Sequence, residues 1–307
     1  RTPSFMSTLR DDMPTVLIAG GSGLIGSQLT RHFKDRGFRV YKLTRKPTKH
    51  GHIFWDPKAE KMSTSKLDKI EVLVNLVGEN IGSKRWTAKR KAEILASRVQ
   101  STHFLASMIP QMTQLKYYIG ASGVNCYDNL PGKVFTEDEP YGHDFLATVV
   151  KEWEAAHQLV LKQVPGSILR ISMVLSRHGG SLHLMKQPIY WGLGAPVGAG
   201  SQTSPWIHID DLCRLMLFAY DTKLEGTFNA LGGNDTNADM TTRLAKWLKR
   251  PLFLPNIPAF ALRLLLGERA VLVLSDLRAS NLKIKAAGFT FKYTSLDSAF
   301  KSFFKKR

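Results

Sequence analysis

The sequence predicts an α/β fold, in which a doubly wound parallel sheet precedes a smaller, mostly helical C-terminal lobe. Three observations predict it. The apolar run 16–19 passes through a glycine-rich turn into a helical segment that begins at Leu24. Strand-like apolar runs then alternate with helical segments as far as Tyr220, the order typical of parallel sheets. Beyond Phe253 helical segments prevail. We therefore expect a flexible tail at 1–13, a main domain over 14–250 and a C-terminal lobe over 251–307.

The glycine-rich turn indicates what this sheet binds. Its glycines stand at three-residue steps, as in Rossmann-type dinucleotide sites. There the first allows a tight turn, the second lets backbone approach the pyrophosphate, and the third permits close helix packing. A lone pattern is weak evidence, and a plain glycine turn is the alternative. Here a helix (24–36, ending at Gly37) and a second strand (38–44) follow in order. We therefore predict a Rossmann-type cofactor turn at Gly20, Gly21, Ser22, Gly23, Leu24, Ile25 and Gly26.

The end of the second strand favours NADP over NAD. Sites that prefer NAD usually carry an Asp or Glu here, which binds the ribose hydroxyls and repels a 2′-phosphate. This chain has Thr44 and Arg45 instead. A hydroxyl and a guanidinium can hydrogen-bond and neutralise a 2′-phosphate. A solvated basic turn before Pro47 is the alternative interpretation.

The alternation of elements continues along the chain. Strands are expected at 53–55, 71–77, 116–121 and 167–171, and helices at 84–108 and 145–161. We expect Asp144 to be the N-cap of the helix at 145–161, and Asp210 to cap a helix that ends near Tyr220. The region after Gly180 should form an ordered loop over the cleft rather than regular structure. Its breakers are Gly192, Gly194, Pro196, Gly198 and Gly200.

The charge is strongly positive, with a formal net charge of +18 over 307 residues and a pI near 9.9. Such a field attracts polyanions, an anionic cofactor among them. The sequence contains no zinc-finger, RRM or KH signature, so we interpret the charge as a solvated basic surface. Nucleic acid is therefore an unlikely partner on sequence grounds.

The cysteines and the apolar stretches exclude further classes of protein. Cys126 and Cys213 form no CxxC, and no Asp/Glu/His set has metal-ligand spacing, so neither a disulfide framework nor a metal site is expected. The first dozen residues lack a secretory h-region. An intracellular location, cytoplasmic or mitochondrial, fits best. The apolar stretches 259–266 and 270–274 are interrupted by charges and are far too short to span a membrane, so we expect no membrane partner.

Several motifs together resemble a known family. They are residues 20–26, Thr44 to Pro47, 75–80, Trp153-Glu154 and 205–211, with 265–268 and 287–291 near the C-terminus. Over nearly the whole chain they resemble the extended or atypical short-chain dehydrogenase/reductases, in their sugar-nucleotide-epimerase-like branch of NADP-binding proteins with its own C-terminal domain. The resemblance implies further cofactor contacts at Leu76 and Val77, at Glu93 and Arg98 on the long helix, and at Val174.

The catalytic residues of that superfamily are incomplete here. Its chemistry uses a Tyr followed four residues later by a Lys that lowers the phenol's pKa. None of the eight tyrosines has such a Lys. Ser122 stands where the resemblance puts a substrate-binding hydroxyl, and Tyr127 is the nearest phenol that could substitute, with a structural role as the alternative. His208 is expected to pack behind a helix start, catalysis being the alternative.

Two functions remain open from the sequence. The first is an NADP(H)-dependent oxidoreductase or epimerase that acts on a small polar, sugar-like substrate, with Ser122 orienting the reacting oxygen and the C-terminal lobe carrying the pocket. The second is an NADPH-binding protein or redox sensor without turnover, which the missing Tyr/Lys pair favours.

Overall fold

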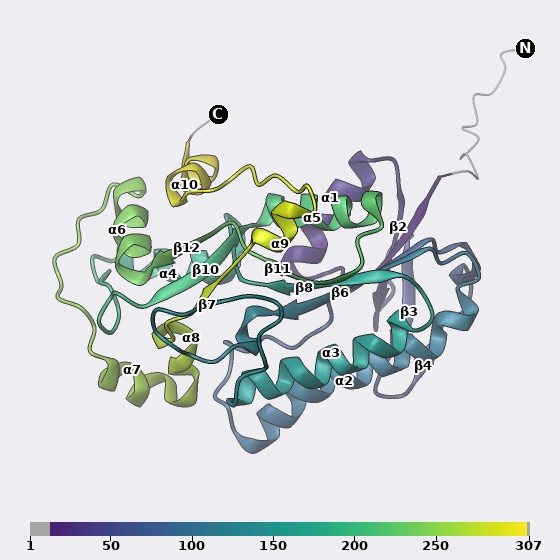
Figure 1. Cartoon of the computed structure of the whole chain (residues 1–307), viewed down its shortest axis with the longest axis horizontal. Coiled ribbons are helices and arrows are strands. Elements are labelled where there is room, and N and C mark those ends of the chain that lie inside the picture. The colour runs from purple at the N-terminus through teal and green to yellow at the C-terminus, as the bar shows by residue number, and fades with distance from the viewer. Residues whose placement is uncertain (1–12, 306–307) are drawn as a thin grey trace, which may run out of the picture.

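The computed structural model describes residues 13–305, so nearly all of the expected N-terminal tail lies outside it. An eight-stranded sheet forms its centre, in the order β11-β8-β6-β5-β1-β2-β3-β4 (Figure 1). Its pairings are parallel except between β3 and β4. The strands are β1 (Thr15–Ala19), β2 (Arg39–Thr44), β3 (His52–Asp56), β4 (Lys61–Met62), β5 (Val72–Asn75), β6 (Tyr117–Gly123), β8 (Gly166–Ile171) and β11 (Gly226–Ala230).

Helices cover both faces of this sheet, which confirms the doubly wound arrangement. In Figure 1 α1 (Leu24–Asp35) and α5 (Ile209–Thr222) lie above the sheet, and α2 (Ala88–Met108) and α3 (Phe145–Leu161) lie below it. The side chains of β1 alternate between two apolar clusters: Val16 belongs to the α1 side and Leu17 to the α2 side. Because both faces are buried, the central strands read as continuous apolar runs.

A smaller lobe is built around the three-stranded sheet β12-β10-β9. Its apolar cluster runs from Leu175 to Phe303, so the lobe includes chain well before residue 251. This cluster therefore joins side chains from both sides of residue 251. The remaining helices and strands are β7 (Val134–Phe135), β9 (Met173–Ser176), α4 (Gly180–Tyr190), β10 (Thr203–His208), β12 (Gly233–Thr236), α6 (Asn237–Trp247), α7 (Ala259–Leu266), α8 (Val271–Leu274), β13 (Arg278–Ala279), α9 (Leu282–Ala286) and α10 (Leu296–Phe304). Of these, α9 packs on the main sheet, because its Ile284 belongs to the cluster of Val16.

Several predicted helix ends are confirmed. The carboxylate of Asp144 accepts a 2.7 Å hydrogen bond from the amide of Ala147, so it caps α3 as expected. Gly37 follows α1 with φ +80°, a conformation that glycine adopts without strain. Four short 3-10 turns complete the described elements: η1 (Leu67–Lys69), η2 (Ile109–Gln111), η3 (Val124–Cys126) and η4 (Gly267–Ala270).

Other predictions about the elements are wrong. The helix expected from residue 84 begins at Ala88, because the Thr87 hydroxyl accepts from the amide of Arg90 and caps it there. The region after Gly180 forms a helix, α4, before the loop starts. The breakers from Gly192 to Gly200 all follow this helix and lie in a loop, as expected, so α4 can pack Leu182 and Ile189 into the smaller lobe.

The cap of α5 is also not the expected one. The cap is the ring of His208 rather than the side chain of Asp210. The His208 ring accepts a 3.0 Å hydrogen bond from the backbone amide of Asp210. His208 is buried between the rings of Tyr293 and Phe303, and this burial lowers its pKa to about 4. The expectation that His208 packs behind a helix start is therefore confirmed. Asp210 instead accepts a hydrogen bond from Gln28 and joins α5 to α1.

Candidate functional site

The glycine-rich turn connects β1 to α1 at the carboxyl edge of the sheet. Gly20 has φ +81°, and a Cβ there would lie 2.8 Å from the carbonyl oxygen of Leu76. A Cβ on Gly26 would collide with the carbonyl oxygen of Gly20. A Cβ on Gly23 would meet only that same oxygen, at an ordinary 3.4 Å. The first and third glycines thus serve the fold itself, whereas Gly23 leaves open space above the turn.

The N-terminus of α1 is open to an anion. No side chain of the described residues caps it, whereas α2 and α3 are each capped by a side chain. Its first turn also contains no acidic residue. Free amide groups and the positive end of the helix dipole therefore point out of the turn that contains Ser22, Leu24 and Ile25, as a bound phosphate requires.

Thr44 and Arg45 end β2 beside this turn, because Leu43 pairs with Ala19 at the end of β1. The Thr44 hydroxyl accepts a 3.2 Å hydrogen bond from the amide of Lys46 and so shapes the bend. Arg45 is exposed, and no hydrogen bond or ion pair ties it to another described residue. Lys42, which the sequence analysis did not single out, lies against Gly21. The region therefore presents positive charge and no carboxylate.

The exit of β5 adjoins the turn on its other side. The amide of Leu76 donates to Ala19, and the side chain of Asn75 accepts from the amide of Val77 at 3.2 Å. Asn75 is itself fixed by donating to the Thr102 hydroxyl at 2.9 Å. The backbone that the sequence predicts to touch the cofactor is thus held rigidly at the carboxyl edge of the sheet.

Arg98 and Glu93 both face this exit from α2. The guanidinium of Arg98 packs against Gly78 and donates to the carbonyl oxygens of Ile94 and Glu79. Burial lowers its pKa to about 10. No carboxylate of the described residues lies within ion-pair distance of it. Glu93 accepts a hydrogen bond from Arg90. The guanidinium of Arg90 also donates to the carbonyl oxygen of Asn80 and so fixes the 79–80 loop. Arg98 is thus a half-buried cation without a counter-ion.

The structure also brings Val174 to the turn. A Cβ on Gly180 would lie 3.1 Å from the side chain of Leu24 and 3.6 Å from the carbonyl oxygen of Val174. The predicted cofactor residues thus come from the turn after β1, the first turn of α1, the ends of β2 and β5, α2 and β9, and they surround one edge of the main sheet.

Ser122 ends β6 in a buried polar cluster centred on Glu154 of α3. Its hydroxyl donates to Glu154 Oε1 at 2.5 Å, and the hydroxyl of Tyr141 donates to Oε2 at 2.6 Å. Arg170 of β8 donates to both oxygens at 2.9 Å. Burial alone would raise the pKa of Glu154. The charge of Arg170 and the hydrogen bonds from Arg170 and the two hydroxyls outweigh burial, so the pKa of Glu154 is lowered. Glu154 is therefore ionised and fully hydrogen-bonded.

Tyr127 belongs to the same cluster, one step further from Ser122. Its hydroxyl accepts from Arg170 at 3.0 Å and donates to Asn229 at 2.7 Å. Burial raises its pKa, the opposite of what a proton-exchanging phenol needs. The phenol that shares a carboxylate with Ser122 is Tyr141, not Tyr127.

Sequence reasoning missed Tyr141, Arg170 and the role of Glu154. One signal was available for Glu154, since it is the single acid on the apolar face of α3 that also contains Val150 and Trp153. An acid that is buried in this way requires a partner. The partner on β8 is not visible in the sequence.

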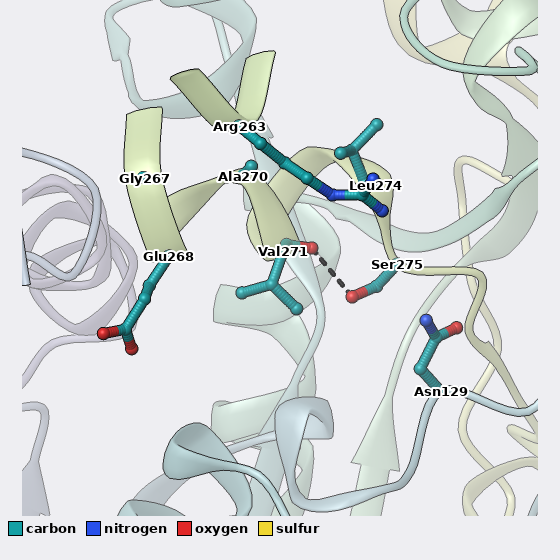
Figure 2. Close-up of a pocket in the computed structure, with 8 residues that line it drawn as sticks. All are labelled: Asn129, Arg263, Gly267, Glu268, Ala270, Val271, Leu274 and Ser275. Atoms are coloured by element: carbon teal, nitrogen blue, oxygen red, sulfur yellow. Dashed lines mark hydrogen bonds between the residues drawn. The ribbon is translucent and has the colours of Figure 1, made fainter. Parts of the chain in front are cut away.

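A pocket of about 420 Å³ lies between the smaller lobe and the loop that follows η3. Figure 2 shows Arg263 extending from α7 toward Leu274, with Asn129 on the opposite wall. The guanidinium of Arg263 has no hydrogen bond or ion pair to another described residue. Arg269 donates to the carbonyl oxygen of Gly82, which holds this segment against the β5 exit loop. The pocket is lined by Asn129, Arg263, Gly267, Glu268, Ala270, Val271, Leu274 and Ser275.

This pocket contains none of the catalytic or cofactor residues predicted from the sequence. Ser122 and Tyr127 are instead buried in the polar cluster of Glu154 and Arg170. Within residues 13–305 no group of three or more His, Cys, Asp or Glu side chains could hold a metal ion. Cys126 and Cys213 are buried free thiols. No helix of the described chain is both long enough and apolar enough to span a bilayer.

Comparison with known families gives two matches. Residues 16–230 match the model of the NAD dependent epimerase/dehydratase family. Residues 257–303 match a domain of unknown function. The second match covers the helical end of the chain, including α7 and α10.

Individual proteins agree with these matches. The mouse epimerase family protein SDR39U1 is 34% identical over 293 residues, covering 93% of this chain and 98% of that protein. The crystal structure of human SDR39U1 with NADPH superposes with a TM-score of 0.88 at 32% identity, covering 95% of this chain and all of that one. A nucleoside-diphosphate sugar epimerase from Corynebacterium glutamicum gives a TM-score of 0.77 at 31% identity, covering 95% of this chain and 58% of that one.

Proposed function

The chain belongs to the NAD dependent epimerase/dehydratase family, and from this membership we propose that it binds NADP(H) and acts on a small polar, sugar-like substrate as an oxidoreductase or epimerase. The uncapped N-terminus of α1, with Arg45 beside it and no acid at the end of β2, carries the proposal. The human relative crystallised with NADPH supports it.

The residues fit this cofactor at three points. Gly23 leaves room for the pyrophosphate over the free amides of α1. Arg45, next to the end of β2, would bind the 2′-phosphate on the adenosine ribose. Arg98 offers an unpaired cation at the β5 exit. Bound NADP(H) would supply the hydride, and the chain's residues would position the substrate and move protons.

Arg45→Ala tests the preference for NADP(H). Loss of a charge-assisted hydrogen bond weakens binding by about 1.5–3 kcal/mol, which is roughly ten- to a hundredfold in NADPH affinity. NADH affinity should barely change, because NADH carries no 2′-phosphate. Calorimetry with both cofactors measures this. Equal affinities of the unsubstituted protein for NADH and NADPH would refute the NADP assignment.

Gly23→Val tests the turn itself. A valine side chain should fill the space that the pyrophosphate needs, so we expect NADPH affinity to fall about a hundredfold or more. The apoprotein should melt near the unsubstituted one, because a Cβ at this position meets only one atom, at 3.4 Å. Gly26→Ala is the matched comparison: its Cβ collides with backbone, so it should lower the melting temperature. If Gly23→Val still binds NADPH, the glycines of the turn serve only to pack the backbone.

We propose that Ser122 orients the reacting oxygen of the substrate. Its own proton is directed to Glu154 Oε1, so its oxygen offers lone pairs to a substrate hydroxyl. A proton leaving that hydroxyl could pass to Ser122 Oγ as the serine proton moves to Glu154. Arg170 makes Glu154 a weak base, so this relay predicts slow turnover. The pocket beside Arg263 and Asn129 is the proposed place for the rest of the substrate.

The alternative is a protein of this fold that holds NADPH without turnover. The absence of a Tyr-x-x-x-Lys pair and the complete internal hydrogen bonding of Glu154 favour it. Steady-state oxidation of NADPH across a panel of sugar-like carbonyl compounds separates the two functions. Turnover of any of them supports the enzyme, and tight NADPH binding with none supports the binding protein.

A further inference from the structure

The smaller lobe exposes large apolar side chains that no part of the proposed function uses. Six of them form what we call the apolar surface: Trp191, Leu193, Phe253, Phe260, Leu264 and Leu265. All six are more than half exposed, and Leu264 reaches 80%. Soluble monomers rarely expose contiguous apolar patches of this kind without a binding role.

Two segments distant in sequence bring these residues together. The amide of Gly198 donates to the carbonyl oxygen of Ile257 at 2.8 Å, and the amide of Ile257 donates to Pro196 at 2.9 Å. The loop after α4 therefore runs beside the loop that leads into α7. On α7 itself, Phe260 and Leu264 are four residues apart and so share one face. The opposite side of α7 is anchored by Leu262, which is buried.

The charges within the two chain segments that carry the apolar surface are basic, and the acid that follows them, Glu268, is ion-paired with Lys91. Residues 184–198 and 249–267 contain no Asp or Glu. They contain four cations: Lys186, Lys249, Arg250 and Arg263. A second copy of this chain would bring the same cations face to face, so self-association is disfavoured. An aromatic and aliphatic surface with a predominantly basic rim is complementary to an anionic bilayer, in which the headgroups attract the cations and the apolar groups enter the acyl boundary.

We propose that this surface docks the protein on anionic lipid bilayers, with α7 lying in the interface. The surface lies on the bilayer and does not cross it, in keeping with the shortness of the apolar stretch 259–266. The docking differs from the expectation of no membrane partner, which rested on that shortness alone. Sequence length excludes a span, whereas only the structure shows which apolar side chains face outward. Since Arg263 of α7 also lines the pocket in Figure 2, the docked face adjoins the pocket.

Vesicle flotation with the full chain tests the proposal. We expect binding to phosphatidylcholine vesicles that contain phosphatidylglycerol, and little binding to phosphatidylcholine alone. Leu264→Ser should weaken binding about tenfold or more, because a buried leucine side chain is lost from the interface. Lys249→Gln should weaken it about fivefold, and raised salt should act in the same direction.

A matched control separates docking from simple charge attraction. Leu282 on α9 is 70% exposed but lies outside the apolar surface, so Leu282→Ser should bind vesicles as the unsubstituted protein does. Unchanged melting temperatures would show that the variants are folded. The proposal is overturned by failure to bind the anionic vesicles, or by binding that Leu264→Ser leaves unchanged. A dimer in sedimentation velocity that Phe260→Ser dissociates would assign the surface to a second copy instead.

Discussion

Replacing Arg170 by methionine should lower the free energy of unfolding by about 3–5 kcal/mol at neutral pH, because it leaves Glu154 buried without its counter-ion. Both side chains are almost fully buried, and their contact is bidentate. Urea denaturation followed by circular dichroism measures the loss. The exposed pair of Arg36 and Asp221 is the matched control, and Arg36→Met should change stability by no more than about 1 kcal/mol.

A double variant shows whether the loss comes from the stranded charge. Arg170→Met combined with Glu154→Leu removes both members of the pair and should recover a large part of the stability. If the double variant is less stable than Arg170→Met alone, the stranded carboxylate is not the cause. NADPH affinity serves as the independent check that the variants keep the main fold.

The same substitution should alter the dependence of stability on pH. The folded protein has a lowered pKa at Glu154, so this group contributes stability that is present above its ordinary pKa and is lost as pH falls through the lowered value. Without Arg170 the buried carboxyl should have a raised pKa, and its contribution reverses in sign. The difference in unfolding free energy between the two proteins should therefore grow as pH rises from about 4 to 7. A difference that stays constant over that range would contradict the assignment.

Ser122→Ala should lower kcat by about a hundred- to ten-thousandfold on any substrate that the carbonyl panel identifies, the range typical of a lost proton-transfer group. NADPH affinity should remain almost unchanged, because the hydroxyl is proposed to face substrate rather than cofactor. Single-turnover kinetics with NADPH already bound separate the chemical step from binding. An unchanged kcat would show that the reacting centre does not lie at the end of β6.

Two tyrosine variants then distinguish the phenols around Ser122. Tyr141→Phe removes the other hydroxyl on Glu154, and Tyr127→Phe removes a hydroxyl that hydrogen-bonds to Arg170 and Asn229 instead. We expect Tyr141→Phe to lower kcat and Tyr127→Phe to leave it nearly unchanged. If Tyr127→Phe instead matches the loss in Ser122→Ala, Tyr127 has the acid role that the sequence leaves open for it.

The sequence by itself determined the α/β architecture and the glycine turn. These features are local: an apolar run buried on both faces reads as a strand wherever it occurs, Gly20 adopts a positive φ, and Gly26 is required by the backbone of the turn just before it. The cap of α3 by Asp144 is equally local. Resemblance between motifs added the proposed cofactor contacts of Glu93, Arg98 and Val174. Periodicity treats Glu93 and Arg98 as ordinary surface.

Only the tertiary structure decided which side chains meet. Glu154 pairs with Arg170 across α3 and β8, and Tyr141 reaches the same carboxylate from a loop, so no spacing rule links them to Ser122. His208 caps α5 in place of Asp210 because the C-terminal rings of Tyr293 and Phe303 pack on it. Exposure is likewise a tertiary property: the apolar side chains of α7 look like core in the sequence, yet the fold leaves one face of that helix in water.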